Sequence, residues 1–242
     1  MLKNKLLVAA LASAFAMPAM AEEAAAFTPS ANVTLTSNYL YRGISQTGNK
    51  PAIQGGFDLA HASGVYAGAW ASSISWLSDY GIASNAGTEI DTYVGYAGAA
   101  GDIGYDVGFL RYNYPGEYGG NLSANTNELY GKVSYKFVSA KYSRSSGNLF
   151  GVADSSGSGY LDLSASYAVE AAGITLGAHY GKQSIANHSA ADYTDYNFSV
   201  AKDVGGYGLS ATYSKTNLSN YIDPQGNDLG KGQLVLAISR KM

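Results

Sequence analysis

Apolar and polar residues alternate along several segments of this chain. The first segment, NVTLTSNYLYR, covers residues 32–42, and the same period of two returns over residues 159–169 and 174–183. Successive side chains of a β-strand point to opposite faces, so each segment predicts a strand with one apolar and one polar face. Repeated segments of about ten residues with this alternation are typical of β-barrels that span a membrane.

Twelve strands of this kind can be placed along the chain. They are expected at residues 31–42, 51–61, 65–74, 88–97, 103–114, 127–136, 138–144, 159–169, 174–183, 193–202, 207–215 and 231–241. In the first strand the expected outward-facing residues are Val33, Leu35, Tyr39 and Tyr41.

The connections between these strands fall into two kinds. Short turns are expected at residues 61–64, 98–102, 137, 170–173 and 203–206, and longer polar loops at residues 43–50, 75–87, 115–126, 145–158, 184–192 and 216–230. The two kinds alternate strictly, as they do in bacterial outer-membrane barrels, which have an even number of strands. The sequence therefore predicts an all-β fold, a transmembrane antiparallel up-and-down β-barrel of about twelve strands.

The first residues have the features of a cleaved signal peptide. Lys3 and Lys5 precede the apolar run 6–17, and residues 19–21 supply the small-x-small pattern of a cleavage site. A retained membrane helix would need roughly twenty apolar residues, more than this run contains. The expected segments are a signal peptide over residues 1–21 cleaved after Ala21, a short periplasmic lead over residues 22–30, and an outer-membrane barrel over residues 31–242.

Tyrosines of the expected outward faces lie near strand ends rather than strand centres. Those near the long loops are Tyr39, Tyr41, Tyr180, Tyr196 and Tyr213, and those near the short turns are Tyr96, Tyr135, Tyr167 and Tyr207. Amphipathic rings prefer the level of the lipid headgroups, so two girdles are expected of a barrel in a bilayer. The alternative, that tyrosine is simply a good strand former, explains their number but not their positions.

Composition and charge narrow the function classes. The chain has 30 glycines, 21 tyrosines and no cysteine, so an exported barrel would have no disulfides and would depend on closure of its sheet. Removal of Lys3 and Lys5 with the signal peptide leaves 13 basic against 18 acidic residues, a net charge of −5. This balance argues against a nucleic-acid partner.

Motifs for catalysis or metal binding are weak. His61-Ala62-Ser63 has the His-x-Ser spacing of outer-membrane phospholipases, but it falls at an expected periplasmic turn, away from the outer leaflet. The run 223–228 places oxygen donors around a glycine without the downstream glutamate of a calcium loop. The expectation is therefore no enzyme activity, no metal and no cofactor.

The inward faces of the expected strands carry charges and amides. The candidates for lining the pore are Arg42, Asp58, Glu89, Asp91, Glu128, Lys132, Asp162, His179 and Asp195, and Lys136 and Lys141 are expected in the same phase. Arg42 is expected to face Glu89 and Asp91 across the lumen, which would create a transverse field. The alternative is a lumen that is closed by pairing among its own side chains.

Several segments of the sequence resemble those of a known family. SNYLYRGISQTGNKPAIQGGFDL (residues 37–59), VYAGAWASSIS from Val65, EIDTYVGY from Glu89 and RYNYPG from Arg111 are similar to the TorF family of proteobacterial porins. The resemblance covers the whole mature chain, with its most specific part in residues 37–59. It implies an outer-membrane barrel and neither catalytic residues nor a particular substrate.

Together these features predict a narrow channel for passive diffusion of small hydrophilic solutes. The expected partners are outer-membrane lipid and small solutes or ions, and association of identical copies is left open. Two alternatives stay open as well: a non-conducting structural or adhesive barrel whose outer loops bind partners, and a lipid-acting enzyme.

Overall fold

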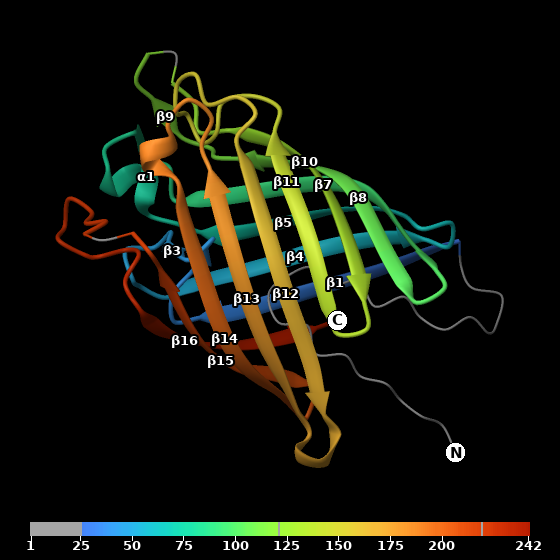
Figure 1. Cartoon of the computed structure of the whole chain (residues 1–242). Helices are drawn as coiled ribbons and strands as arrows, with labels where there is room; N and C mark the ends of the chain where they lie inside the picture. Colours follow the sequence, from blue (N-terminus) through green and yellow to red (C-terminus); the bar gives the residue numbers. More distant parts are fainter. Residues whose placement is uncertain (1–25, 121, 219) are drawn as a thin grey trace.

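The computed structural model describes residues 26–120, 122–218 and 220–242, and these residues form a closed barrel of twelve antiparallel strands (Figure 1). The predicted signal peptide and the first four residues of the predicted lead, residues 22–25, lie outside the described residues. The barrel strands are β1 (Phe27–Thr36), β4 (Ala52–His61), β5 (Val65–Ser73), β7 (Thr88–Ala100), β8 (Ile103–Asn113), β10 (Thr126–Tyr135), β11 (Val138–Ser145), β12 (Gly159–Val169), β13 (Ile174–Ser184), β14 (Tyr193–Val204), β15 (Tyr207–Thr216) and β16 (Gln233–Lys241).

The remaining elements are short and lie in the connections. They are β2 (Leu40–Tyr41) paired with β3 (Ile44–Ser45), β6 (Ala83–Ser84) paired with β9 (Glu117–Tyr118), the helix α1 (Trp76–Asp79), and the 3₁₀ turns η1 (Glu170–Ala172) and η2 (Ser189–Ala191). No helix within residues 26–120, 122–218 and 220–242 is both long and apolar enough to cross a membrane.

The barrel closes because its first and last strands pair. Leu35 of β1 lies opposite Ile53 of β4 on one side and Ile238 of β16 on the other. Every barrel strand of the described chain therefore has two neighbours, and no sheet edge is left to pair with another chain.

The predicted alternation of loops and turns is confirmed. β2, β3, α1, β6 and β9 all belong to long connections, and Figure 1 shows α1, β3 and β9 gathered at one end of the barrel. We call this end the loop end and the opposite end, where short turns join the strands, the turn end.

The predicted bounds of the first strand, residues 31–42, are wrong. β1 begins at Phe27 and ends at Thr36, whose hydroxyl donates to the carbonyl oxygen of Asn38 at 2.8 Å. A side chain that bonds the backbone two residues further on favours a turn over a strand. The alternating residues that follow form the hairpin β2–β3, and Arg42 and Gly43 at its tip have positive φ angles of 47° and 79°.

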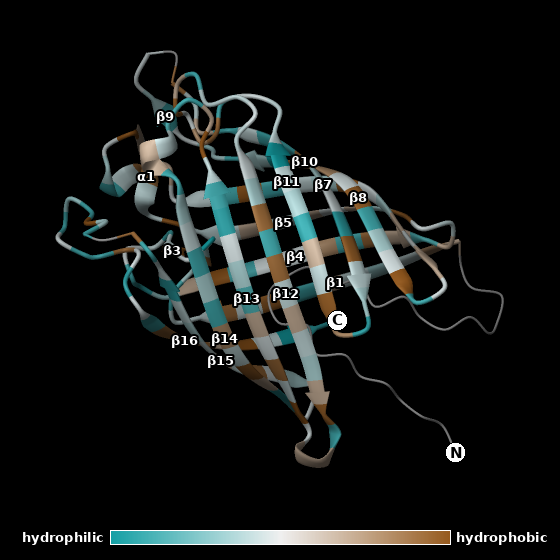
Figure 2. Ribbon diagram, viewed as in Figure 1, coloured by the Kyte–Doolittle hydropathy of each residue, from teal (hydrophilic) through white to brown (hydrophobic). Residues whose placement is uncertain are grey.

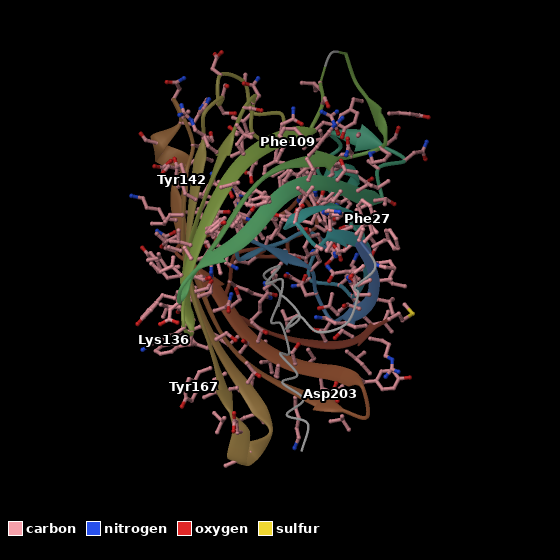
Figure 3. The ribbon with its side chains drawn as sticks, turned by 90° about the vertical axis from the view of Figure 1, so that its right-hand side faces the viewer. Phe27, Phe109, Lys136, Tyr142, Tyr167 and Asp203 are labelled. Atoms are coloured by element: carbon pink, nitrogen blue, oxygen red, sulfur yellow. The ribbon has the colours of Figure 1, made fainter. Side chains whose placement is uncertain are left out.

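The outer wall is apolar in the phase that the sequence predicted. Leu35, Ile53, Leu163 and Leu236 are all exposed, and apolar bands run along the strands in Figure 2. The wall tyrosines Tyr96, Tyr135, Tyr167, Tyr180, Tyr196, Tyr207 and Tyr213 are exposed as well. Figure 3 shows Tyr167 pointing away from the barrel.

Two tyrosines assigned to the girdle near the long loops are placed differently. Tyr39 and Tyr41 lie in the connection between β1 and β4, where Tyr39 is buried and Tyr41 packs against the same apolar cluster. The prediction that they face lipid is wrong because β1 ends before either residue is reached.

Candidate functional site

The inner wall carries the charged residues singled out from the sequence. Alternate residues of each strand are shielded while their neighbours are exposed, as in β10, where Glu128 is buried and Leu129 is 57% exposed. The strand-borne candidates in this inward phase are Asp58 on β4, Glu89 and Asp91 on β7, Glu128 and Lys132 on β10, Asp162 on β12, His179 on β13 and Asp195 on β14. Lys136, expected to point inward and labelled in Figure 3, lies instead in the turn between β10 and β11. Its ammonium group is 5.0 Å from the centre of the Tyr135 ring.

The connection between β1 and β4, residues 37–51, brings an arginine into this lumen. We call it loop 1. The Arg42 guanidinium at its tip donates from Nη2 to both carboxylate oxygens of Glu128, at 2.8 Å each. Its Nη1 donates to the Gln183 side chain at 2.7 Å, and the guanidinium lies 4.2 Å from the centre of the Tyr160 ring. Loop 1 therefore reaches from its own strands to β10, β12 and β13.

Gly43 allows the tip of loop 1 to fit against the wall. A Cβ built at Gly43 would lie 2.7 Å from the Cβ of Asp195 and from Cγ2 of Thr216, and the φ of 79° is one that favours glycine. The hairpin tip is thus held between the arginine contacts on one side and β14 and β15 on the other.

The expected partners of Arg42 across the lumen are not the observed ones. Glu89 Oε1 accepts a hydrogen bond of 3.0 Å from the Tyr39 hydroxyl of loop 1. Burial raises the pKa of the Tyr39 phenol above its ordinary value, so this group remains a neutral donor. Glu89 Oε2 and Asp91 Oδ1 have no hydrogen-bond partner within the described part of the chain. Arg42 pairs with Glu128 instead, because it sits on loop 1 and not at the end of β1.

A second polar network is centred on His179. Its Nε2 lies 2.9 Å from Asp195 Oδ1, and its Nδ1 lies 3.3 Å from Asp162 Oδ2. The Tyr160 hydroxyl donates to Asp195 Oδ2 at 2.8 Å, and Ser164 donates to Asp162 Oδ1 at 2.5 Å. These contacts link β12, β13 and β14 on the lumen side.

A third set of contacts was missed from the sequence. The Tyr66 hydroxyl donates to Asp106 at 2.5 Å and also bonds the Tyr130 hydroxyl, while Tyr93 donates to Asp58. Alanines mask the alternation in β5, and glycines occupy the inward positions on either side of Asp106 in β8, which hid the inward position of Tyr66 and Asp106. The signal that could have found these contacts is the glycine opposite each tyrosine on the neighbouring strand. A tyrosine ring can lie over a glycine because that residue has no side chain.

The loop end of the barrel is filled by an apolar cluster. Tyr39 of loop 1 packs there with Leu77, Tyr112, Tyr114 and Ala124, which come from wall strands and from the other long connections. This cluster and the Arg42 contacts lie at the same end of the barrel.

The His-x-Ser pair closes its own turn. His61 Nδ1 lies 2.8 Å from the Ser63 hydroxyl and accepts the Ser63 backbone N–H at 3.1 Å. The imidazole also packs on the Phe27 ring, with centroids 4.8 Å apart. These contacts stabilise the turn end.

Asp223, at the start of the run considered for calcium, is hydrogen-bonded within its own loop. Its oxygens accept from the backbone N–H groups of Gln225 and Asn227 and from the Asn227 side chain, at 2.7–3.0 Å.

A closed antiparallel barrel with an apolar outer wall and a polar inner wall belongs to the porin-like class of folds. Residues 20–242 match the model of the family Gcw_chp, described as a bacterial protein of unknown function, and the chain belongs to this family. Comparison with curated proteins gave no match.

Two solved porins have a similar fold at low sequence identity. One is the KdgM porin in complex with disordered oligogalacturonate, with a TM-score of 0.53, 8% identity, and coverage of 88% of this chain and 98% of that chain. The other is the NanC porin, with a TM-score of 0.54, 12% identity, and coverage of 86% and 97%.

Proposed function

We propose that this protein is a porin-like channel of the bacterial outer membrane through which small hydrophilic solutes diffuse passively. The observation that supports it best is the contrast between the two walls of a closed barrel. Exposed leucines, isoleucines and valines cover the outer wall, whereas carboxylates, lysines and hydroxyls line the inner one. Such a barrel offers an apolar surface to lipid and a wet surface to solutes.

The narrowest part of the proposed path lies where loop 1 crosses the lumen. Arg42 and Glu128 neutralise each other there, and Gln183 and Tyr160 complete the contact. A constriction made by an inward-folded loop would limit passage to small solutes. The resemblance of residues 37–59 to TorF porins and the fold of the KdgM and NanC porins agree with this proposal.

A second candidate is a barrel that does not conduct and whose outer loops bind a partner. The observation in its favour is the apolar cluster around Tyr39, Tyr112 and Tyr114, which fills the loop end.

Single-channel recording in planar bilayers separates the two candidates. The channel proposal predicts stepwise conductance for the refolded protein, and a larger step when residues 38–50 are replaced by a short Gly-Ser linker. This replacement is compatible with the barrel because Thr36 and Ala52 already pair across the hairpin. Silent bilayers for both proteins, each shown to be folded, would favour the non-conducting barrel.

A further inference from the structure

Two lysines on the inner wall lie directly opposite each other. Lys132 of β10 and Lys141 of β11 are partners in the antiparallel register, and both belong to the inward phase of their strands. The Cβ atoms of directly opposite residues are about 4.5–5.5 Å apart, and like charges in such positions repel. This pair therefore destabilises the wall unless something compensates its charge.

The N–H donors of the two ammonium groups are mostly unused. Neither lysine forms a salt bridge or a hydrogen bond with any residue of the described chain, and the contact of Lys141 is with the Tyr130 ring, 4.1 Å from its centroid. An ammonium group has three donors, so most of the donors of the pair remain available to the lumen.

Two carboxylates lie beside the lysines in the sheet, but their oxygens accept hydrogen bonds from other residues. Asp106 lies opposite Lys132 on β8, and Asp162 lies opposite Lys141 on β12. Asp106 Oδ1 accepts from Tyr66, and both oxygens of Asp162 are in contact with Ser164 or His179.

Glu128, two inward positions from Lys132 toward the loop end, is held by Arg42 at 2.8 Å. Each nearby acid thus has its own donor. Asp106 and Asp162 offset the charge of the lysines across the register, but no acid of the described chain takes up the N–H donors of the pair, which remain available.

We propose that Lys132 and Lys141 form a binding site for the carboxylate group of small monocarboxylate solutes, one oxygen for each ammonium. Asp106 and Asp162 flank the pair, so a second negative charge on the solute would be repelled while an ammonium group would be accepted. Organic monocarboxylates and amino acids fit this pattern, and dicarboxylates do not. This inference rests on the proposed channel function, in which a weak site along the path favours entry and still allows release.

Binding can be measured without conductance, by titrating the ¹⁵N-labelled barrel in detergent micelles with sodium propionate. The backbone amide signals of Lys132 and Lys141 should shift and saturate, whereas sodium chloride at equal ionic strength should leave them in place. Sodium succinate should bind more weakly than propionate. Glycine, a zwitterion, should shift the same signals.

Neutral variants test the two lysines directly. Lys132→Gln and Lys141→Gln should each weaken propionate binding about tenfold, the effect of one charge-assisted hydrogen bond. Lys182→Gln is the matched control because Lys182 is exposed on the opposite phase of β13. Slower gel migration after heating confirms that each variant is folded.

The outcomes keep the two proposals apart. The carboxylate site is overturned, even if the barrel conducts, if the native protein shows no saturable shift or if both lysine variants bind propionate as tightly as the native protein does. Propionate binding that depends on both lysines supports the site even if bilayers remain silent, and the silence then counts against the channel alone.

Discussion

Arg42 shows how the contacts of a single side chain can hold a loop across the lumen. Its guanidinium is 7% exposed and its partner Glu128 is 3% exposed, so both charges are removed from water. Such a pair is stable only when its remaining donors and acceptors are used, and Gln183, Tyr112 and the Tyr160 ring do this. Loop 1 is thereby fixed across the path at one charged contact.

Replacement of Arg42 by glutamine should loosen loop 1 and change the ion selectivity of the proposed channel. Once the positive charge of Arg42 is removed, Glu128 has no cationic partner near the proposed narrowest part of the lumen. We expect a larger single-channel conductance and a reversal potential in a salt gradient that shifts toward cation preference. Both quantities can be measured in planar bilayers.

Two variants serve as comparisons for this experiment. Arg144→Gln removes an exposed arginine from the outer phase of β11 and should leave both quantities unchanged. Glu128→Gln should shift the reversal potential in the opposite direction, because it leaves Arg42 unneutralised. If Arg42→Gln conducts with an unchanged reversal potential, Arg42 does not lie at the narrow point.

At the scale of strands, tyrosines on the inner wall lie over glycines of the neighbouring strand. Gly68 is the register partner of Tyr93, Gly95 of Tyr66, and Gly108 of Tyr130. A Cβ at any of these glycines would collide with the hydroxyl end of the tyrosine ring. The strand glycines therefore make room for rings that carry the inner hydrogen bonds.

Gly68→Val should destabilise the barrel by about 1–3 kcal/mol, since the new side chain displaces the Tyr93 ring from its place beside Asp58. Urea unfolding in lipid vesicles, followed by tryptophan fluorescence, measures the change. Gly131→Val is the control, because a Cβ there meets only Val107 Cγ1, at 4.0 Å. Equal losses for the two variants would show that the effect comes from backbone freedom rather than from the ring.

The two phases of β12 should respond differently to charge. Leu163 is 43% exposed on the outer wall, and Leu163→Arg should cost about 2–4 kcal/mol if this position lies near the middle of the bilayer. Ser166→Arg, on the inward phase of the same strand, should cost much less because its side chain faces the lumen. Unfolding in vesicles compares them, and similar costs would contradict the assignment of the two walls.

At the scale of the whole molecule, closure determines how the protein should behave in a membrane. β1 and β16 seal the sheet, so unfolding must break a complete ring of paired strands. The full-length protein should fractionate with the outer membrane, with residues 1–21 removed. It should also migrate differently on detergent gels before and after heating. Recovery in the soluble periplasmic fraction would contradict both the proposed location and the proposed function.

The strand pattern was predictable because the face of the barrel wall on which a side chain lies depends only on its position along the strand. A residue faces lipid or lumen according to its parity, so β12 and β13 could be placed nearly to the residue, and Asp162, His179 and Asp195 could be assigned to the inner wall. The weak points were β5, where glycine and alanine fill both phases, and β8, where two of the inward positions are glycines and parity carries less information.

The sequence by itself therefore determined the number of strands, the alternation of loops and turns, and the two faces of most strands, because each depends on neighbours in the chain. Only the tertiary structure decided which charges meet. Glu128 and Arg42 are far apart along the chain, and their contact depends on how loop 1 folds back through the closed barrel. Alternation continues from β1 into loop 1, so the pattern could not show that the strand ends at Thr36. The reason is physical: the turn after Thr36 and the contact of Arg42 with the distant Glu128 are possible only if residues 37–42 leave the strand.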